Sequence, residues 1–140
     1  MAGILGKDTK PEIIVRRYLH ACGFRYRLHR KDLPGTPDLV LSKYRLAIFV
    51  HGCFWHRHLG CIYATTPGNR REFWEDKLNK NVLRDQKQVS LLIERGWRVV
   101  IVWECGLKHL SGEISTLQVM IKGANERFQV WPEKPPKVKL

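Results

Sequence analysis

Three cysteines and a histidine have the spacing of a metal site. Cys53, His58 and Cys61 are separated by four and then two residues, so one loop could wrap them around a single ion. Cys105 comes just after the apolar segment 97–103 and would reach that loop if this segment lies beside the apolar strand that precedes it. The four side chains would then form the Cys3His set of structural zinc sites. We predict a structural zinc ion; the alternative is a group of unrelated buried thiols and a surface histidine.

A second group has the residue types needed for hydrolysis. Asp38 stands at the start of one predicted strand and His51 at the end of the next, and His56 follows inside the cysteine loop. Phosphodiester hydrolysis needs a carboxylate to hold a hard divalent cation and a group that activates or orients water. Histidine titrates near neutral pH, so His51 or His56 could be the base. An ordinary turn would also explain Asp38, and the two spare histidines make the hydrolytic interpretation as good as that one.

The pattern of apolar residues predicts the elements that must position these groups. A capping box with an early proline, Thr9 to Glu12, begins a helix, and alternation over residues 24–29 indicates a strand with a basic outer face that includes His29. In chain order we predict a helix over 11–22, strands over 24–29, 39–41 and 46–50, a long helix over 72–95, a strand over 97–103 and a last helix from 111 to about 121. This order suits an α/β fold, with a central mixed sheet and helices on both faces.

Length and charge limit the class of protein. The 140 residues fit a single domain, 1–140, in which residues 124–140 form a basic, proline-rich tail with little regular structure. The formal charge of +12 comes from basic residues spread along the chain, which points to nucleic acid as the partner. No segment approaches the roughly 20 apolar residues of a membrane span, and no secretory signal is present. We therefore expect a cytosolic protein without a membrane partner, whose cysteines are thiols or metal ligands.

The chain resembles the very-short-patch repair (Vsr) endonucleases, a branch of the restriction-endonuclease-like PD-(D/E)XK superfamily. The resemblance extends from the amino terminus to about Lys108, and its most specific part is the sequence HGCFWH with the later cysteine. The matching segments are KDTKPE at 7–12, LPGTPDLVL at 33–41, IFVHGCFWH at 48–56, residues 73–81 and WRVVIVWEC at 97–105. The resemblance implies a three-layer fold of the restriction-endonuclease type with a structural zinc loop.

The same resemblance implies a reaction and roles for individual residues. The protein would nick one DNA strand on the 5′ side of the thymine in a T·G mismatch, leaving a 5′-phosphate and a 3′-hydroxyl. Asp38 would bind magnesium together with the backbone carbonyl of Val50, and His56 would be the general base. His51 would contact the phosphate or a metal-bound water, and Glu12 would bond to metal-bound water. Histidines would thus replace the second acid and the lysine that are usual in the superfamily.

Aromatic and polar residues match the mismatch-reading part of the family. By this resemblance, Phe54, Trp55 and Trp74 would insert between base pairs beside the mismatch, where unstacking costs least and stacking on the rings is recovered. Lys77 and Asn81, four residues apart on one helix, would lie near the mismatched bases. Without the resemblance, Trp74 would be interpreted as a core residue at helical spacing.

Two other functions remain open from the sequence. One is a related nicking endonuclease with a different trigger, such as another mismatch, a lesion or a fixed sequence. The other is a zinc-stabilised DNA-binding module without catalysis, although such a module has no need for Asp38, His51 and His56 together. Because a mismatch marks one strand and has no two-fold symmetry, we expect a monomer on the DNA. Mismatch-repair proteins are candidate partners, and the bacterial cytosol is the expected location.

Overall fold

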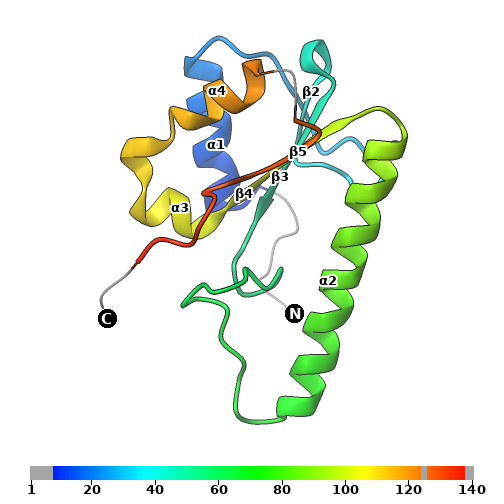
Figure 1. Ribbon diagram of the computed structural model, residues 1–140, viewed down its shortest axis with the longest axis vertical. Coiled ribbons are helices and arrows are strands. Elements are labelled where there is room, and N and C mark those ends of the chain that lie inside the picture. Colours follow the sequence, from blue (N-terminus) through cyan, green and yellow to red (C-terminus); the bar gives the residue numbers. More distant parts are fainter. Residues whose placement is uncertain (1–7, 124–125, 138–140) are drawn as a thin grey trace.

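The computed structural model describes residues 8–123 and 126–137, so Lys7 and, in the predicted tail, residues 124–125 and 138–140 lie outside the described residues. Figure 1 shows the arrangement of the elements along the chain. They are α1 (Lys10–Ala21), β1 (Arg27–Leu28), β2 (Leu39–Leu41), the 3-10 helix η1 (Ser42–Tyr44), β3 (Leu46–His51), α2 (Arg71–Glu94), β4 (Arg98–Trp103), α3 (Glu104–His109), the 3-10 helix η2 (Ser111–Glu113), α4 (Thr116–Lys122) and β5 (Phe128–Trp131).

The described strands form one mixed sheet in the order β1-β2-β3-β4-β5. The pairs β1·β2 and β2·β3 are antiparallel, whereas β3·β4 and β4·β5 are parallel. In the register of the β3·β4 pair, His51 lies opposite Trp103, so both strands end at the same edge of the sheet. The mixed sheet is therefore confirmed, and so is the neighbouring position of the two long apolar strands on which the predicted metal site depends.

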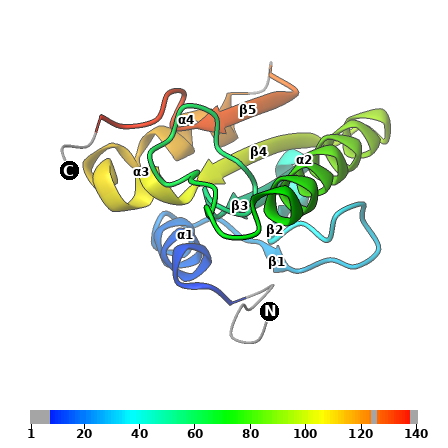
Figure 2. The same ribbon diagram turned by 90° about the horizontal axis from the view of Figure 1, so that it is seen from below.

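Helices cover both faces of the sheet. Successive side chains of a strand point to opposite faces. On one face, Ile48 and Val100 pack in a cluster with apolar residues of α1, α3 and α4, and on the other face Phe49 and Ile101 pack with Leu92 of α2. Figure 2 shows α1, α3 and α4 on one side of the sheet and α2 on the other. The result is a three-layer α/β arrangement.

The first helix begins as the sequence predicts. The Thr9 hydroxyl accepts a hydrogen bond from the Glu12 backbone N–H at 3.4 Å, and Pro11 stands in the first turn. Val15 and Leu19 are completely buried against the sheet. The helix ends at Ala21, and Gly23 follows with a φ of +87°, a conformation that costs other residues free energy. The capped, buried helix holds Glu12 in a fixed place.

The long helix α2 reaches beyond the sheet. Leu92, near its end, packs in the core, and Leu78 is the other buried residue of the helix. The first half of α2 runs past the edge of the sheet, where the loop of residues 52–70 accompanies it (Figure 1). A helix whose first half has so little core contact serves there as a support for this loop.

The strand predicted over residues 24–29 is shorter than expected. Only Arg27 and Leu28 pair with β2, and both are exposed. Phe24 is buried in the core beside α1, and the Tyr26 hydroxyl donates a hydrogen bond to the Arg16 carbonyl at 3.1 Å. The alternating aromatic residues therefore pack against the first helix and do not extend the strand.

The region after β4 differs most from the prediction. Residues 104–109 form the unpredicted helix α3, and the last helix begins at Thr116, after the 3-10 turn at 111–113. The expectation of little regular structure beyond residue 123 is wrong for Phe128–Trp131, because this short apolar segment pairs with β4. The Arg98 guanidinium guides the chain to that edge by donating hydrogen bonds to four carbonyls, those of Met120, Ile121, Gly123 and Glu126. None of the helices in the described residues is long and apolar enough to cross a membrane.

Candidate active site and metal centre

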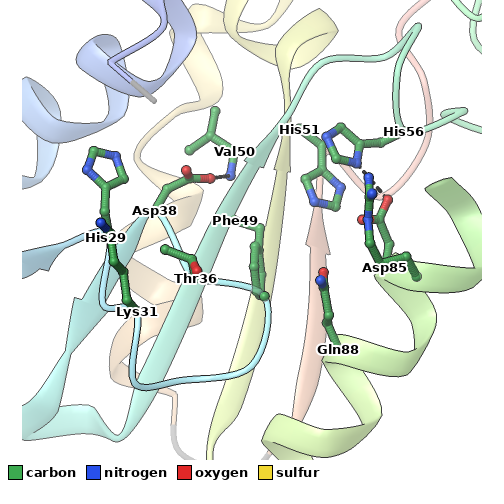
Figure 3. Close-up of a pocket in the computed structure, with 12 residues that line it drawn as sticks. His29, Lys31, Thr36, Asp38, Phe49, Val50, His51, His56, Asp85 and Gln88 are labelled. Carbon is green, nitrogen blue, oxygen red and sulfur yellow. Dashed lines mark hydrogen bonds and ion pairs between the residues drawn. The ribbon is translucent and has the colours of Figure 1, made fainter. Parts of the chain in front are cut away.

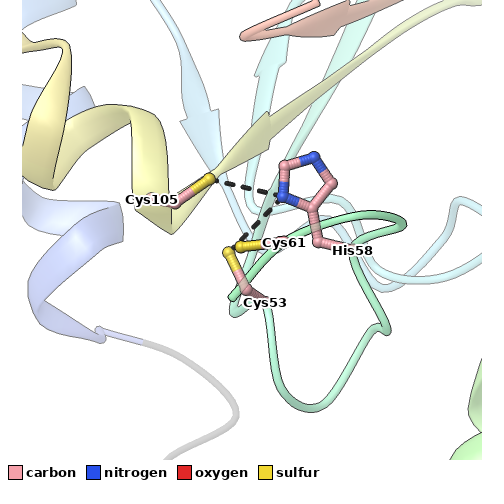
Figure 4. A group of neighbouring side chains, drawn as sticks. All are labelled: Cys53, His58, Cys61 and Cys105. Carbon is pink, nitrogen blue, oxygen red and sulfur yellow. Dashed lines mark hydrogen bonds between the residues drawn. The ribbon is translucent and has the colours of Figure 1, made fainter. Parts of the chain in front are cut away.

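The predicted metal ligands come together at the edge where β3 and β4 end. One ligand atom from each of Cys53, His58, Cys61 and Cys105 lies within 4.8 Å of the others. His58 Nδ1 is 3.7 Å from the Cys53 sulfur and 3.3 Å from the Cys105 sulfur. Figure 4 shows the loop after β3 bringing three of the side chains to Cys105, in the first turn of helix α3. The predicted juxtaposition of the four residues is confirmed.

The chemistry of these four groups fits a metal ion. Burial lowers the pKa of His58, which keeps the imidazole neutral, and the ring stacks on Trp103 with centroids 4.2 Å apart. Burial also raises the pKa of Cys53 to about 11 and raises that of Cys105, and all four cysteines are free thiols. Three crowded sulfurs become ligands only when a cation favours their thiolate form. The Cys3His set can therefore hold a metal that takes sulfur and nitrogen ligands.

A pocket of about 550 Å³ contains the predicted hydrolytic residues. It lies between the loop before β2, the end of β3 and the inner side of α2, and Figure 3 shows Asp38 between His29 and Val50. At Gly35 the loop comes so close to α2 that an added Cβ would be 2.9 Å from the Gln88 side-chain oxygen. The lining residues are His29, Lys31, Gly35, Thr36, Asp38, Phe49, Val50, His51, His56, Arg84, Asp85 and Gln88.

Asp38 is held at the foot of β2 by the neighbouring strand. Its Oδ2 accepts a hydrogen bond from the Val50 backbone N–H at 2.8 Å. Burial raises the pKa of Asp38 to about 6, while the Val50 N–H and the charge of Arg16 act in the opposite direction. A carboxylate with a raised pKa in a pocket is a candidate functional group, and a bound cation would favour its charged form.

His51 and His56 lie against each other in the same pocket. Their rings stack with centroids 3.7 Å apart and an interplanar angle of 5°. Burial lowers the pKa of His51 well below its usual value, and the neighbouring His56 lowers it further. His51 is therefore neutral near pH 7 and can donate one hydrogen bond and accept another.

Asp85 is a member of this group that the sequence analysis missed. Its Oδ2 lies 2.6 Å from His56 Nδ1, and Figure 3 shows the contact. A signal was present in the sequence, because Asp85 falls three residues after Val82 and four before Val89, on the apolar stripe of α2. A carboxylate on such a stripe needs a partner, and here the partner is His56.

Glu12 is near the pocket but does not line it. It is only 1 % exposed, and its Oε2 accepts hydrogen bonds from Arg16 Nη2 and, at 3.3 Å, from the Asp8 backbone N–H. The same oxygen lies 2.9 Å from Nε2 of His29. His29, which the sequence placed on the outer face of a strand, does line the pocket. The structure thus brings Asp38, His51 and His56 into one pocket. Glu12 lies outside it, in contact with the lining residue His29.

The predicted DNA-reading residues also gather in one place. Phe54, Trp55 and Trp74 have ring centroids 4.9, 5.9 and 6.0 Å apart in pairs. Lys77 Nζ lies 6.0 Å from the Trp55 ring, and the Asn81 amide donates a hydrogen bond to the Trp55 carbonyl at 3.3 Å. All five residues are half-buried. Trp74 packs on the loop and belongs to neither core cluster, so the interpretation as a core residue is wrong.

Comparison with known proteins adds independent information. The family described as DNA mismatch endonuclease Vsr matches residues 1–61. A type II nicking enzyme of Xanthomonas oryzae pv. oryzae is 50% identical over 111 residues, which is 79% of this chain and 81% of that protein. A type II nicking enzyme of Neisseria meningitidis serogroup A is 46% identical, over 78% of this chain and 77% of that protein. The DNA mismatch endonuclease Vsr of Escherichia coli K12 is also 46% identical, over 77% of this chain and 69% of that protein.

Proposed function

The chain belongs to the Vsr family of DNA mismatch endonucleases, and from this premise we propose that it nicks duplex DNA on the 5′ side of the thymine in a T·G mismatch. It is an endonuclease, a hydrolase that acts on DNA. The observation that carries the proposal is the pocket in which Asp38, His51 and His56 meet. A carboxylate and two histidines around one cavity form the set that hydrolysis of a phosphodiester requires.

Two metal ions are part of the proposal. Asp38 and the Val50 carbonyl would hold magnesium, because oxygen donors suit a hard cation and one Asp38 oxygen is already oriented by the Val50 N–H. When bound, magnesium neutralises charge on the phosphate oxygens. Zinc would occupy the site of Cys53, His58, Cys61 and Cys105 in a structural role, because the set and its closeness match a tetrahedral site.

The histidines and Asp85 would handle the proton and the phosphate. An ionised Asp85 can only accept a hydrogen bond, so Nδ1 of His56 carries the proton and Nε2 is left with a lone pair. His56 would therefore accept the proton of the attacking water as general base. The neutral His51, stacked on His56, would orient the phosphate or a metal-bound water. The products would be a 5′-phosphate and a 3′-hydroxyl.

Recognition of the mismatch is assigned to the aromatic cluster beside the pocket. Trp55 directly precedes His56, so a ring inserted between base pairs would lie within one residue of the proposed base. Phe54 and Trp74 would add two further stacking surfaces, and Lys77 and Asn81 would face the mismatched bases. Because Trp55 and the proposed general base His56 are neighbours in the chain, insertion of the Trp55 ring into the DNA would position His56 for cleavage.

The wider proposals follow from the family and the layers of the fold. We propose that residues 1–140 form a single domain with the restriction-endonuclease-like PD-(D/E)XK fold, which agrees with helices on both faces of a mixed sheet. The protein would act as a monomer on mismatched DNA in the bacterial cytosol. Mismatch-repair proteins are the proposed partners.

The experiment is a nicking assay with magnesium on end-labelled duplexes that differ only at one central pair: T·G, T·A, C·G or A·G. We expect cleavage only in the T·G duplex and only of the strand that carries the thymine. Asp38→Ala should remove nicking but keep mismatch binding, because it removes the proposed magnesium ligand. Glu94→Ala is the matched control, since it removes an exposed carboxylate near the far end of α2.

The outcomes separate the candidate functions. Equal cleavage of another duplex would replace the T·G proposal by a nickase with a different trigger. Mismatch binding without cleavage by the wild-type protein would favour a non-catalytic binding module. Nicking by Asp38→Ala at the wild-type rate would contradict the assignment of the magnesium ligand.

A further inference from the structure

His29 connects two groups that the proposed reaction uses. It directly follows β1, and its backbone N–H donates a hydrogen bond to the Asp38 carbonyl at 3.2 Å. This bond comes one residue after the last pair of the register, Leu28 opposite Leu39, and His29 itself leaves the strand with a φ of +48°. The backbone thus ties His29 to Asp38, and both residues line the pocket.

The ring of His29 is tied to the first helix on its other side. His29 Nε2 lies 2.9 Å from Glu12 Oε2, and the two side chains are 17 % and 2 % exposed. An ionised carboxylate only accepts hydrogen bonds, so Nε2 of His29 carries the hydrogen and donates a hydrogen bond to Glu12. Arg16 and the Asp8 backbone N–H bind the same Glu12 oxygen. Of these three partners of Glu12, only His29 also lines the pocket.

The buried Glu12 carboxylate needs these donors. A charged group in the interior is strongly unfavourable unless it is paired and hydrogen-bonded, so loss of one donor changes where the carboxylate lies. Arg16 already supplies one full positive charge there, and its charge also acts on Asp38. What His29 adds is therefore a connection between α1 and Asp38, the residue just before β2.

We propose that His29 is a positioning residue of the cleavage site, which fixes the Glu12 carboxylate relative to Asp38 through its hydrogen bond to Glu12 and its backbone hydrogen bond to Asp38. The inference rests on the proposed function, because the site being positioned is the proposed magnesium site. Groups that orient metal ligands affect metal affinity or activity by about 10- to 100-fold. His29 acts on the reaction through Glu12 and Asp38.

The test compares three variants with the wild-type, zinc-loaded protein. His29→Ala removes the donor, whereas His29→Gln keeps an N–H group at a similar distance from the backbone. His20→Ala is the control, because His20 is an exposed histidine in the last turn of α1, away from Glu12 in the first turn. Two quantities are measured: Mn²⁺ affinity by electron paramagnetic resonance in the presence of the T·G duplex, and the magnesium concentration for half-maximal nicking.

We expect His29→Ala to weaken Mn²⁺ binding by about tenfold or more and to raise the half-maximal magnesium concentration similarly. His29→Gln should recover most of both losses, His20→Ala should change neither, and binding of the T·G duplex without a divalent cation should stay the same. A double-mutant cycle with Glu12→Ala should be non-additive, because both changes remove the same hydrogen bond.

Wild-type metal dependence in His29→Ala, or an equal defect in His29→Gln, would overturn the proposal. If His29→Ala does not fold, His29→Asn takes its place, since the shorter side chain loses the Glu12 contact while its polarity is kept. A wild-type protein that cleaves no duplex would contradict the proposed function, and the Mn²⁺ affinities of the variants would still decide the role of His29.

Discussion

Replacing Asp38 by asparagine should make the protein more stable while removing its activity. Burial raises the pKa of Asp38 from the ordinary 3.8 to about 6, so the folded protein disfavours the charged form. Asparagine has nearly the same shape, carries no charge and can still accept the hydrogen bond of the Val50 N–H. The substitution therefore removes the cost of burying a charge and keeps the local contact.

The sign and size follow from the pKa shift. Because the pKa in the folded state is raised, the folded state holds the proton more tightly between about pH 4 and pH 6, and the wild-type protein loses stability as the pH rises through this range. A shift of roughly two units corresponds to about 3 kcal/mol at most, reached near pH 7.5, and roughly half of this remains at pH 5. The free energy of unfolding of Asp38→Asn should thus be about 1 to 3 kcal/mol higher than that of the wild type at pH 7.5, with a smaller difference at pH 5.

The assay is urea unfolding of the zinc-loaded proteins between pH 5 and pH 7.5, without added magnesium. Asp32→Asn is the matched control: this carboxyl is exposed, and the hydrogen bond from Arg30 lowers its pKa, so the variant should gain no stability. Added magnesium should stabilise the wild type but not Asp38→Asn, since a ligand stabilises only the state that binds it. An Asp38→Asn variant that is less stable at pH 7.5, or a difference that does not grow with pH, would refute the reasoning.

Three further predictions concern the other parts of the site. Asp85→Ala should slow nicking about 100-fold with little change in mismatch binding, because His56 loses the acceptor that fixes its ring. Single-turnover kinetics measure this rate, and a wild-type rate would show that Asp85 has no part in the mechanism. Cys61→Ser should release the metal and lower the melting temperature, as shown by metal analysis with thermal unfolding, since a structural metal contributes folding free energy. A fully stable variant without metal would disprove the structural role. Trp74→Ala should weaken binding of the T·G duplex by about 1 to 3 kcal/mol in a competition assay, and an equal loss on the matched T·A duplex would argue against a wedge at the mismatch.

The parts of the structure that the sequence predicted are those with strong local signals. The capping box marked the start of α1 at Thr9, and the apolar segments around Ile48 and Val100 identified the two central strands. The cluster of possible metal ligands was also predictable, because the parallel arrangement of these two strands is enough to bring Cys105 to the loop that holds Cys53.

The parts that were missed depend on contacts between distant residues. The place of Asp85 on the apolar stripe of α2 shows that this carboxylate needs a partner, but only the structure identifies that partner as His56, 29 residues away. The alternating pattern placed His29 on the outer face of a strand, whereas in the structure its Nε2 lies 2.9 Å from Oε2 of Glu12 on α1. Strand β5 lies in a segment rich in proline and lysine, and its pairing with β4 depends on the carbonyls that Arg98 gathers. Such long-range partners leave no periodic pattern in the sequence.

The loop after β3 combines several proposed functions in one short segment. Within nine residues, 53–61, it contains three of the four proposed metal ligands, two members of the aromatic cluster and the proposed base. Tight backbone hydrogen bonds, from the His56 N–H to the Gly52 carbonyl and from the His58 N–H to the Cys53 carbonyl, fix the spacing. An insertion between Cys53 and His58 would displace all three functions at once, so a change of length there should be tolerated far less than one at 62–70. Loss of a metal from this loop should therefore disturb the aromatic cluster and the proposed base together, so the metal-free protein should lose mismatch binding and nicking at the same time.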